Sequence, residues 1–328
     1  MIDEWTLAAG QSAVLVTVAA CAGSVPRGPG TRMMVAAEAL AGTVGGGHLE
    51  LRAIEIGRAM LNEGRPRHFE RFALGPTLGQ CCGGVVHLAF ELADPAQVQL
   101  LAGRRSQASW RMTALDGEAV SSLFDEHGTQ LAGARTPAFE AAGATRLIVA
   151  AGRRWLLAKV DAPRAHVVLF GAGHVGTALA SALAALPCTV TWIDERADQF
   201  PATSPANVTM EASEAPEDLV AAAPPGAWYL VMTHSHALDQ RITEAVLARP
   251  DIAWCGLIGS STKRAQFEHR LRARGVPEAR IAAMACPIGL PGIEGKEPGV
   301  IAASVAAQLL TLWSAVAAGN PPTMASSA

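Results

Sequence analysis

The chain has 328 residues, of which 50% are hydrophobic, and its formal net charge is −3. A basic excess is the usual footprint of nucleic-acid binding, and it is missing here, so we expect no nucleic-acid partner. The six cysteines are irregularly spaced, which argues against a disulfide framework in a chain of this length. The acidic first four residues carry no basic signal-peptide region, and we expect a cytoplasmic protein.

The first 160 residues mix strand-like and helix-like segments, which predicts an α+β domain at residues 1–160. Apolar residues recur at helical spacing after His48 and again over 95–101. Strand-like runs are expected at 14–19, 31–36, 42–44, 65–72, 85–90, 110–115, 120–124, 146–150 and 154–160.

A different pattern begins near residue 161. Continuous apolar runs at 167–170, 189–193, 228–232 and 253–258 suit strands that are buried on both faces. Helical patterns at 177–185, 238–247 and 263–274 separate or follow them. This alternation predicts a Rossmann-like, doubly wound parallel sheet at residues 161–318, followed by a flexible tail at 319–328, and the fold class is α/β.

The second domain opens with a dinucleotide-type fingerprint. Gly171, Gly173 and Gly176 form G-x-G-x-x-G between an expected strand and an expected helix. Gly173 would let a pyrophosphate approach the helix N-terminus, and Asp194, at the end of the next strand, could hydrogen-bond a ribose hydroxyl. The alternative is a nucleotide-type fold that serves as a platform without a bound nucleotide.

Polar residues follow the next two expected strands of the same sheet. The first loop carries His234, His236 and Asp239, which could bind a metal, move a proton or grip an anion. The second carries Ser260 and Lys263, which suit an anion at a helix N-terminus. The alternative is that these residues are ordinary helix caps and solvated side chains.

The first domain has glycine-rich loops of its own. Gly45, Gly46 and Gly47 lead into a helix, where free N–H groups favour an anion, although Glu50 also suits the helix dipole there. A second loop reads Gln80, Cys81, Cys82, Gly83. Adjacent cysteines form only a strained ring and lack zinc-site spacing, so the pair could present soft sulfur to a ligand or be two buried thiols.

The uncharged segment 300–318 places Ser304, Gln308 and Thr311 on one helical face. This favours an amphipathic helix of the fold over a membrane span, and we expect no membrane association.

The ordered set of motifs resembles the XdhC/CoxI family, the accessory proteins of xanthine dehydrogenase and related molybdenum hydroxylases. The resemblance covers nearly the whole chain. Its matching segments are residues 23–27, 42–50, 79–84, 171–176, 233–239, 256–263, 286–290 and 295–304.

The resemblance implies a chaperone that binds the molybdenum cofactor, protects it during sulfuration and delivers it to the apo-dehydrogenase without turning over a substrate. The cargo would be molybdopterin or a dinucleotide form of it, with NAD(P) as the alternative ligand. The glycine loops would supply anion donors, Gln80 a hydrogen bond to the pterin, and Cys81 or Cys82 a transient metal ligand or a thiol that handles sulfur. No catalytic residue is assigned.

The expected partners are an apo xanthine dehydrogenase or related hydroxylase, a cysteine desulfurase and a second copy of the chain. Two other functions stay open. One is an NAD(P)-dependent oxidoreductase that uses Gly171–Gly176, Asp194 and either His234 or His236. The other is a nucleotide-binding regulator.

Overall fold

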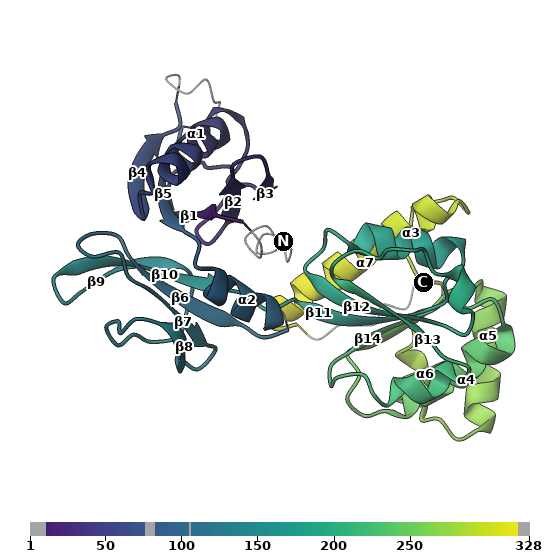
Figure 1. Ribbon diagram of the computed structural model, residues 1–328. Helices are drawn as coiled ribbons and strands as arrows, with labels where there is room; N and C mark the ends of the chain where they lie inside the picture. Colours follow the sequence, from purple (N-terminus) through teal and green to yellow (C-terminus); the bar gives the residue numbers. More distant parts are fainter. Residues whose placement is uncertain (1–10, 76–82, 105, 321–328) are drawn as a thin grey trace. The chain divides into compact units, whose positions relative to one another are not determined.

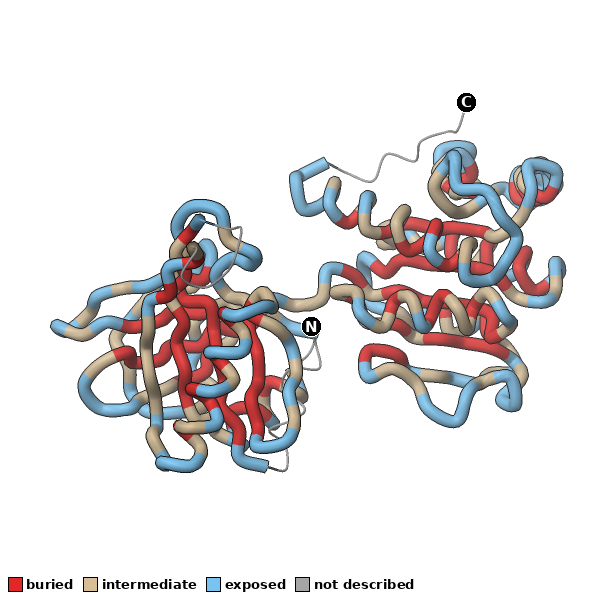
Figure 2. Tube along the Cα trace, turned by 90° about the horizontal axis from the view of Figure 1, so that it is seen from above, coloured by how far each residue is buried: buried red, intermediate tan, exposed pale blue. Residues whose placement is uncertain are grey.

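The computed structural model describes residues 11–75, 83–104 and 106–320. The chain divides into two compact units, Met1–Ala162 and Pro163–Ala328. Each unit is built around buried strands, which Figure 2 shows in red between more exposed segments.

The first unit holds two antiparallel five-stranded sheets, and Figure 1 labels their strands. In spatial order the first sheet contains β3 (Leu40–Gly42), β2 (Arg32–Ala36), β1 (Ala13–Ala22), β5 (Val85–Leu92) and β4 (Arg67–Ala73). The second contains β8 (Gln130–Gly133), β7 (Ser121–Asp125), β6 (Ser109–Ala114), β10 (Arg153–Val160) and β9 (Arg146–Ala150).

Helix α1 (Gly47–Glu63) covers one face of the first sheet. Its buried residues Leu49, Ala53, Ile56 and Met60 recur at helical spacing and pack on the valines of β1. The helix ends where Gly64 adopts a left-handed conformation (φ 64°), which glycine does without a Cβ penalty. α1 therefore supplies the helical layer of this unit.

The opposite face of the first sheet packs against the second sheet and α2 (Pro95–Gly103). Apolar contacts join Leu15 and Met34 to Leu123. A buried ion pair crosses between the sheets: Arg111 Nη1 of β6 lies 3.1 Å from Glu91 Oε1 of β5. Thr113 Oγ1 donates to the same carboxylate at 3.1 Å.

The second unit is a parallel five-stranded sheet with helices on both faces, which confirms the predicted α/β class (Figure 1). Its strand order is β13 (Val208–Ala212), β12 (Cys188–Asp194), β11 (Ala165–Phe170), β14 (Trp228–Val231) and β15 (Trp254–Leu257). Two short helical turns, η4 (Ala197–Gln199) and η5 (Pro216–Val220), lie in the connections. The order reverses at β11, so the crevice at its carboxyl end is the usual place for a ligand.

Alternating side chains of the central strands point to opposite helical layers. Leu169 packs with α3 (His174–Leu183) and α7 (Pro298–Ala317) on one face. Phe170 packs with α4 (His236–Ala248), α5 (Ser261–Ala273) and α6 (Glu278–Ala282) on the other. Both faces of the sheet are therefore covered, which explains the continuous apolar runs in these strands.

Helix α7 is long and apolar enough to cross a membrane by length and composition alone, and within the described residues it is the one helix that passes this test. In the structure it buries Val305, Leu309 and Trp313 against the sheet layer of the second unit. The Trp313 ring lies 6.2 Å from that of Trp228, edge to face. α7 is therefore one of the helices that cover the sheet of the second unit.

We predict that Arg111→Ala lowers the free energy of unfolding by about 3–5 kcal/mol, because it leaves the carboxylate of Glu91 buried without its cation. Urea unfolding followed by circular dichroism measures the change. The matched control is Arg52→Ala, which breaks an exposed pair with Glu55 on α1 and should cost less than about 0.5 kcal/mol. Equal losses in the two variants would contradict the prediction.

Candidate functional site

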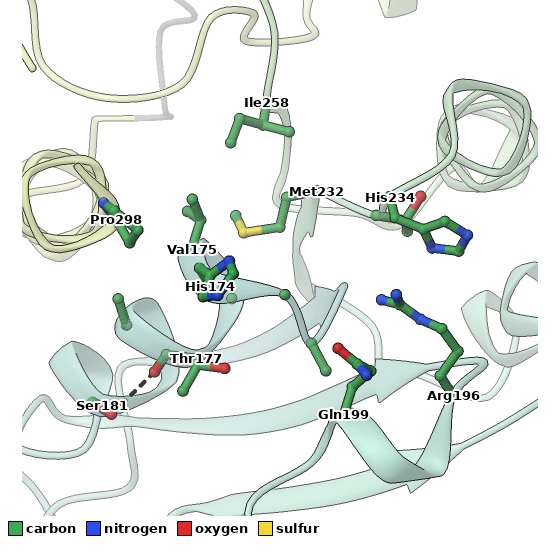
Figure 3. Close-up of a pocket in the computed structure, with 15 residues that line it drawn as sticks. His174, Val175, Thr177, Ser181, Arg196, Gln199, Met232, His234, Ile258 and Pro298 are labelled. Carbon is green, nitrogen blue, oxygen red and sulfur yellow. Dashed lines mark hydrogen bonds between the residues drawn. The ribbon is translucent and has the colours of Figure 1, made fainter. Parts of the chain in front are cut away.

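A pocket of about 820 Å³ lies in the crevice of the second unit, beside the first turn of α3. We call it the crevice pocket, and Figure 3 shows its lining. It is lined by Ala172, Gly173, His174, Val175, Gly176, Thr177, Ala178, Ser181, Arg196, Gln199, Met232, Thr233, His234, Ile258 and Pro298.

The three fingerprint glycines have different steric environments. A Cβ on Gly171 (φ 114°) would lie 2.3 Å from the carbonyl oxygen of Met232, and one on Gly176 would lie 2.0 Å from that of Gly171. A Cβ on Gly173 would meet nothing within 4 Å. The outer two glycines therefore allow the loop to pack on the sheet, while Gly173 leaves open space beside the pocket.

Asp194 at the end of β12 holds this glycine loop in place. It is 3% exposed, and its Oδ2 accepts hydrogen bonds from Ala172 N at 2.6 Å and from Arg196 Nη2 at 3.0 Å. Its Oδ1 accepts from the Arg196 backbone N and Nε, both at 2.9 Å. Burial alone would raise the pKa of Asp194, but these hydrogen bonds outweigh burial and hold the pKa below its ordinary value.

Arg196 is a pocket residue that the sequence reasoning did not single out. Its side chain is one-third exposed and reaches the pocket from the loop after β12, as does that of Gln199 (Figure 3). The hydrogen bonds that Arg196 donates to Asp194 raise the pKa of Arg196. The sequence signal for Arg196 as a pocket residue is its position, because it follows a parallel strand at the carboxyl edge of the sheet, where ligands bind.

The loop after β14 brings Thr233 and His234 to the pocket. His234 Nε2 lies 3.4 Å from Glu195 Oε1, and both side chains are partly exposed. His236 begins α4, is exposed and does not line the pocket. The structure thus brings one of the two predicted histidines to the crevice.

Asp239 and Lys263 form a buried ion pair behind the pocket wall. Lys263 Nζ lies 2.6 Å from Asp239 Oδ2 and also donates to the Ile258 carbonyl at 2.8 Å. Asp239 Oδ1 accepts from the backbone N of Thr233 at 2.9 Å and from its hydroxyl at 2.7 Å. The pair therefore fixes two lining residues, Thr233 and Ile258, on neighbouring loops. Ser260 caps α5 by accepting a hydrogen bond from Lys263 N.

The first unit brings its glycine-bearing segments together at one end of the strands of the first sheet. Gly84 N donates to the Ser24 carbonyl at 3.0 Å, and a Cβ on Gly23 would lie 3.2 Å from Gly84 Cα. A Cβ on Gly45 would lie 2.6 Å from Cγ of Pro26. We call residues 23–27, 43–50 and 83–84 the loop cluster.

The carboxylate of Glu50 takes up part of the donor capacity of this loop cluster. Its Oε2 accepts from the backbone N of Val44 at 3.2 Å and of Gly46 at 3.1 Å, and from the hydroxyl of Thr43. Gly45, Gly46 and Gly47 all have positive φ. The anion at this helix N-terminus is thus a side chain of the protein itself.

Gln80, Cys81 and Cys82 lie outside the described residues, in the segment that joins β4 to β5. Gly83 is exposed, and a Cβ there would meet nothing within 4 Å. Elsewhere in the described chain, burial raises the pKa of the thiols of Cys188 and Cys255 to about 12 and that of Cys286 to about 11. These three thiols therefore stay protonated and are poor metal ligands. Across the described segments, no group of three or more His, Cys, Asp or Glu residues could hold a metal ion.

The chain matches models of a known protein family in both units. A family model described as the XdhC Rossmann domain matches residues 167–309, and one described as the XdhC and CoxI family matches residues 6–73. The chain belongs to the XdhC and CoxI family. The two matches hold the crevice pocket and most of the loop cluster, while residues 80–84 fall between them.

This XdhC/CoxI chain is also similar to two individual proteins. It is 26% identical over 294 residues to YqeB of Escherichia coli K12, described as uncharacterized, and the match covers 88% of this chain but spans only 41% of that protein. A crystal structure from Bacillus halodurans, described as a xanthine dehydrogenase, superposes with a TM-score of 0.72 at 19% identity, and the match covers 94% of each chain. At this identity the second likeness establishes the fold.

We predict that Gly176→Ala lowers the free energy of unfolding of the XdhC/CoxI chain by about 1–3 kcal/mol, because the new methyl group collides with the Gly171 carbonyl. Thermal unfolding measures the change. Gly173→Ala is the matched control in the same loop, where the Cβ enters open space and the cost should stay below about 1 kcal/mol. A destabilised Gly173→Ala beside an unaffected Gly176→Ala would show that the geometry of the loop is different.

Proposed function

We propose that this protein is a carrier of the molybdenum cofactor, which protects the cofactor and delivers it to an apo xanthine dehydrogenase or a related molybdenum hydroxylase. The observation that carries the proposal is membership of the XdhC and CoxI family, with matches in both units in chain order. An accessory role in xanthine dehydrogenase maturation is what that membership suggests.

The crevice pocket has groups that suit part of this cargo. The cofactor is a pterin that holds molybdenum through a dithiolene and carries a phosphate. Arg196, His174 and His234 line the pocket and would donate hydrogen bonds to a phosphate or to pterin oxygens. The open space at Gly173 would let a ligand approach the backbone.

The loop cluster contributes differently to the proposal. Its amides at Val44 and Gly46 already bind Glu50, so these groups do not support a free phosphate site. What supports a cargo contact there is the sequence Gln80-Cys81-Cys82, which enters β5 through Gly83 and Gly84 beside the Ser24 carbonyl. Cys81 or Cys82 would then supply the soft sulfur that a molybdenum centre accepts.

The proposed partners follow from the same role. The apo-hydroxylase receives the cargo, a cysteine desulfurase supplies sulfur to it, and a second copy of the chain would help to bury a labile cofactor. We propose the cytoplasm as the place where these steps occur.

An oxidoreductase that binds NAD(P) is the second candidate, and the crevice pocket beside the G-x-G-x-x-G helix is the observation that favours it. A nucleotide-binding regulator would use the same pocket without turnover. Native mass spectrometry of protein isolated from a molybdate-supplied host, with elemental analysis for molybdenum, separates the three. Bound pterin and molybdenum support the carrier; dinucleotide alone, with or without turnover, supports the other two.

We predict that Cys81→Ala/Cys82→Ala protein retains less than about one tenth of the wild-type molybdenum and activates apo-dehydrogenase correspondingly less, because it lacks the soft ligands. Molybdenum per chain and activation of added apo-enzyme are the two measurements. The matched control is Cys21→Ala, a partly exposed free thiol at the end of β1 in the same unit. Wild-type stoichiometry and activation in the double variant would exclude a role for both thiols.

A further inference from the structure

Asp194 occupies the position at which Rossmann-type proteins commonly recognise a ribose. In such folds an acidic residue at the end of the second strand accepts hydrogen bonds from a ribose hydroxyl. Here the carboxylate is 3% exposed, and both of its oxygens accept hydrogen bonds from Ala172 or Arg196. A ribose hydroxyl would have to break one of these bonds, so Asp194 is poorly placed to recognise it.

Arg196 lines the pocket wall in front of Asp194. Its Nε and Nη2 donate to Asp194, and among the described residues none accepts a hydrogen bond from its Nη1. Figure 3 shows its guanidinium directed toward the pocket, on the same side as His234. The ion pair with Asp194 therefore orients a guanidinium edge toward any ligand in the crevice.

The hydrogen-bond donors of the lining favour an anion. Arg196, His174 and His234 line the pocket, and among the described residues no aspartate or glutamate belongs to the lining. Two carboxylates face these groups from outside the lining: Asp194, whose Oδ1 lies 2.9 Å from Arg196 Nε, and Glu195, whose Oε1 lies 3.4 Å from His234 Nε2. A guanidinium that is held in place is the side chain best suited to a phosphate with several acceptor oxygens.

We propose that the crevice pocket selects ligands that carry a phosphate monoester, which Arg196 binds, over ligands that present free ribose hydroxyls at that place. The pocket volume of about 820 Å³ suits a cofactor-sized ligand. Two sources share this chemistry: the 2′-phosphate of an NADP-type nucleotide, and the terminal phosphate of the pterin cargo. The second source rests on the proposed function, and the first does not.

The first arm of the test compares NADP⁺ with NAD⁺ by isothermal titration on the full-length protein. Selection by Arg196 predicts that NADP⁺ binds about tenfold or more tightly than NAD⁺, and that Arg196→Gln abolishes the difference. The matched control is Arg241→Gln, which breaks an arginine–carboxylate pair with Glu217 outside the pocket, and it should keep the preference. Equal binding of the two nucleotides, or tighter binding of NAD⁺, overturns the nucleotide form of the proposal.

The second arm uses protein isolated from a molybdate-supplied host. If neither nucleotide binds, the proposal requires that Arg196→Gln lowers the bound pterin and molybdenum about tenfold or more while Arg241→Gln does not. Unchanged retention in Arg196→Gln, together with no NADP⁺ preference, overturns the proposal as a whole. If that variant still carries molybdenum, the carrier function is retained. If the wild type prefers NADP⁺ but carries no molybdenum, the carrier function is excluded and the phosphate site is retained.

A second variant tests the proposal if Arg196→Gln does not fold. Arg196→Gln leaves Asp194 with hydrogen bonds from the backbone N of Ala172 and of residue 196. Should Arg196→Gln unfold, Arg196→Lys keeps the positive charge and removes the planar guanidinium. The proposal then predicts an NADP⁺ preference that is reduced but present, and an undiminished preference contradicts the role of the guanidinium.

Discussion

The shape of the crevice pocket in the second unit depends on one buried carboxylate. Asp194 accepts a hydrogen bond from Ala172 N in the glycine loop and three more from the backbone and side chain of Arg196. Through these bonds the end of β12 fixes both the loop before α3 and the arginine beside the crevice pocket. Burial of a charge costs free energy unless it is paired and hydrogen-bonded, and here every part of the pairing also shapes the pocket.

Internal carboxylates organise the other loops as well. Asp239 holds Thr233 and pairs with Lys263, which in turn holds the Ile258 carbonyl. In the first unit, Glu50 holds the backbone amides that lead into α1. In each case residues that look from sequence like ligand-binding groups bind one another. In the second unit these pairs position groups that line the crevice pocket, namely Arg196, Thr233 and Ile258.

Much of the fold could be predicted because local periodicity encodes it. The runs of β11, β12, β14 and β15 are apolar on both faces, and their alternation with helices predicts a parallel sheet. Strands β8 and β13 were not predicted because they are short, half-exposed edge strands. The pairing of β1 with β5, which joins β1–β3 to β4 and β5 in the first sheet, depends on contacts far apart in sequence. At the site, the fingerprint glycines were predicted from their spacing and His234 from its place after an expected strand, whereas Arg196 was missed because its role comes from the fold around Asp194. The ligand contacts of all these residues stay predictions.

Anomalous X-ray diffraction at the molybdenum absorption edge, on crystals of protein isolated from a molybdate-supplied host, tests the central claim most directly. It locates the metal without assuming which residues hold it. A carrier of the molybdenum cofactor predicts a molybdenum peak next to the loop cluster or the crevice pocket, with the cofactor phosphate within hydrogen-bond distance of a donor of the chain. Crystals with no molybdenum, or with a peak far from both sites, would contradict the account.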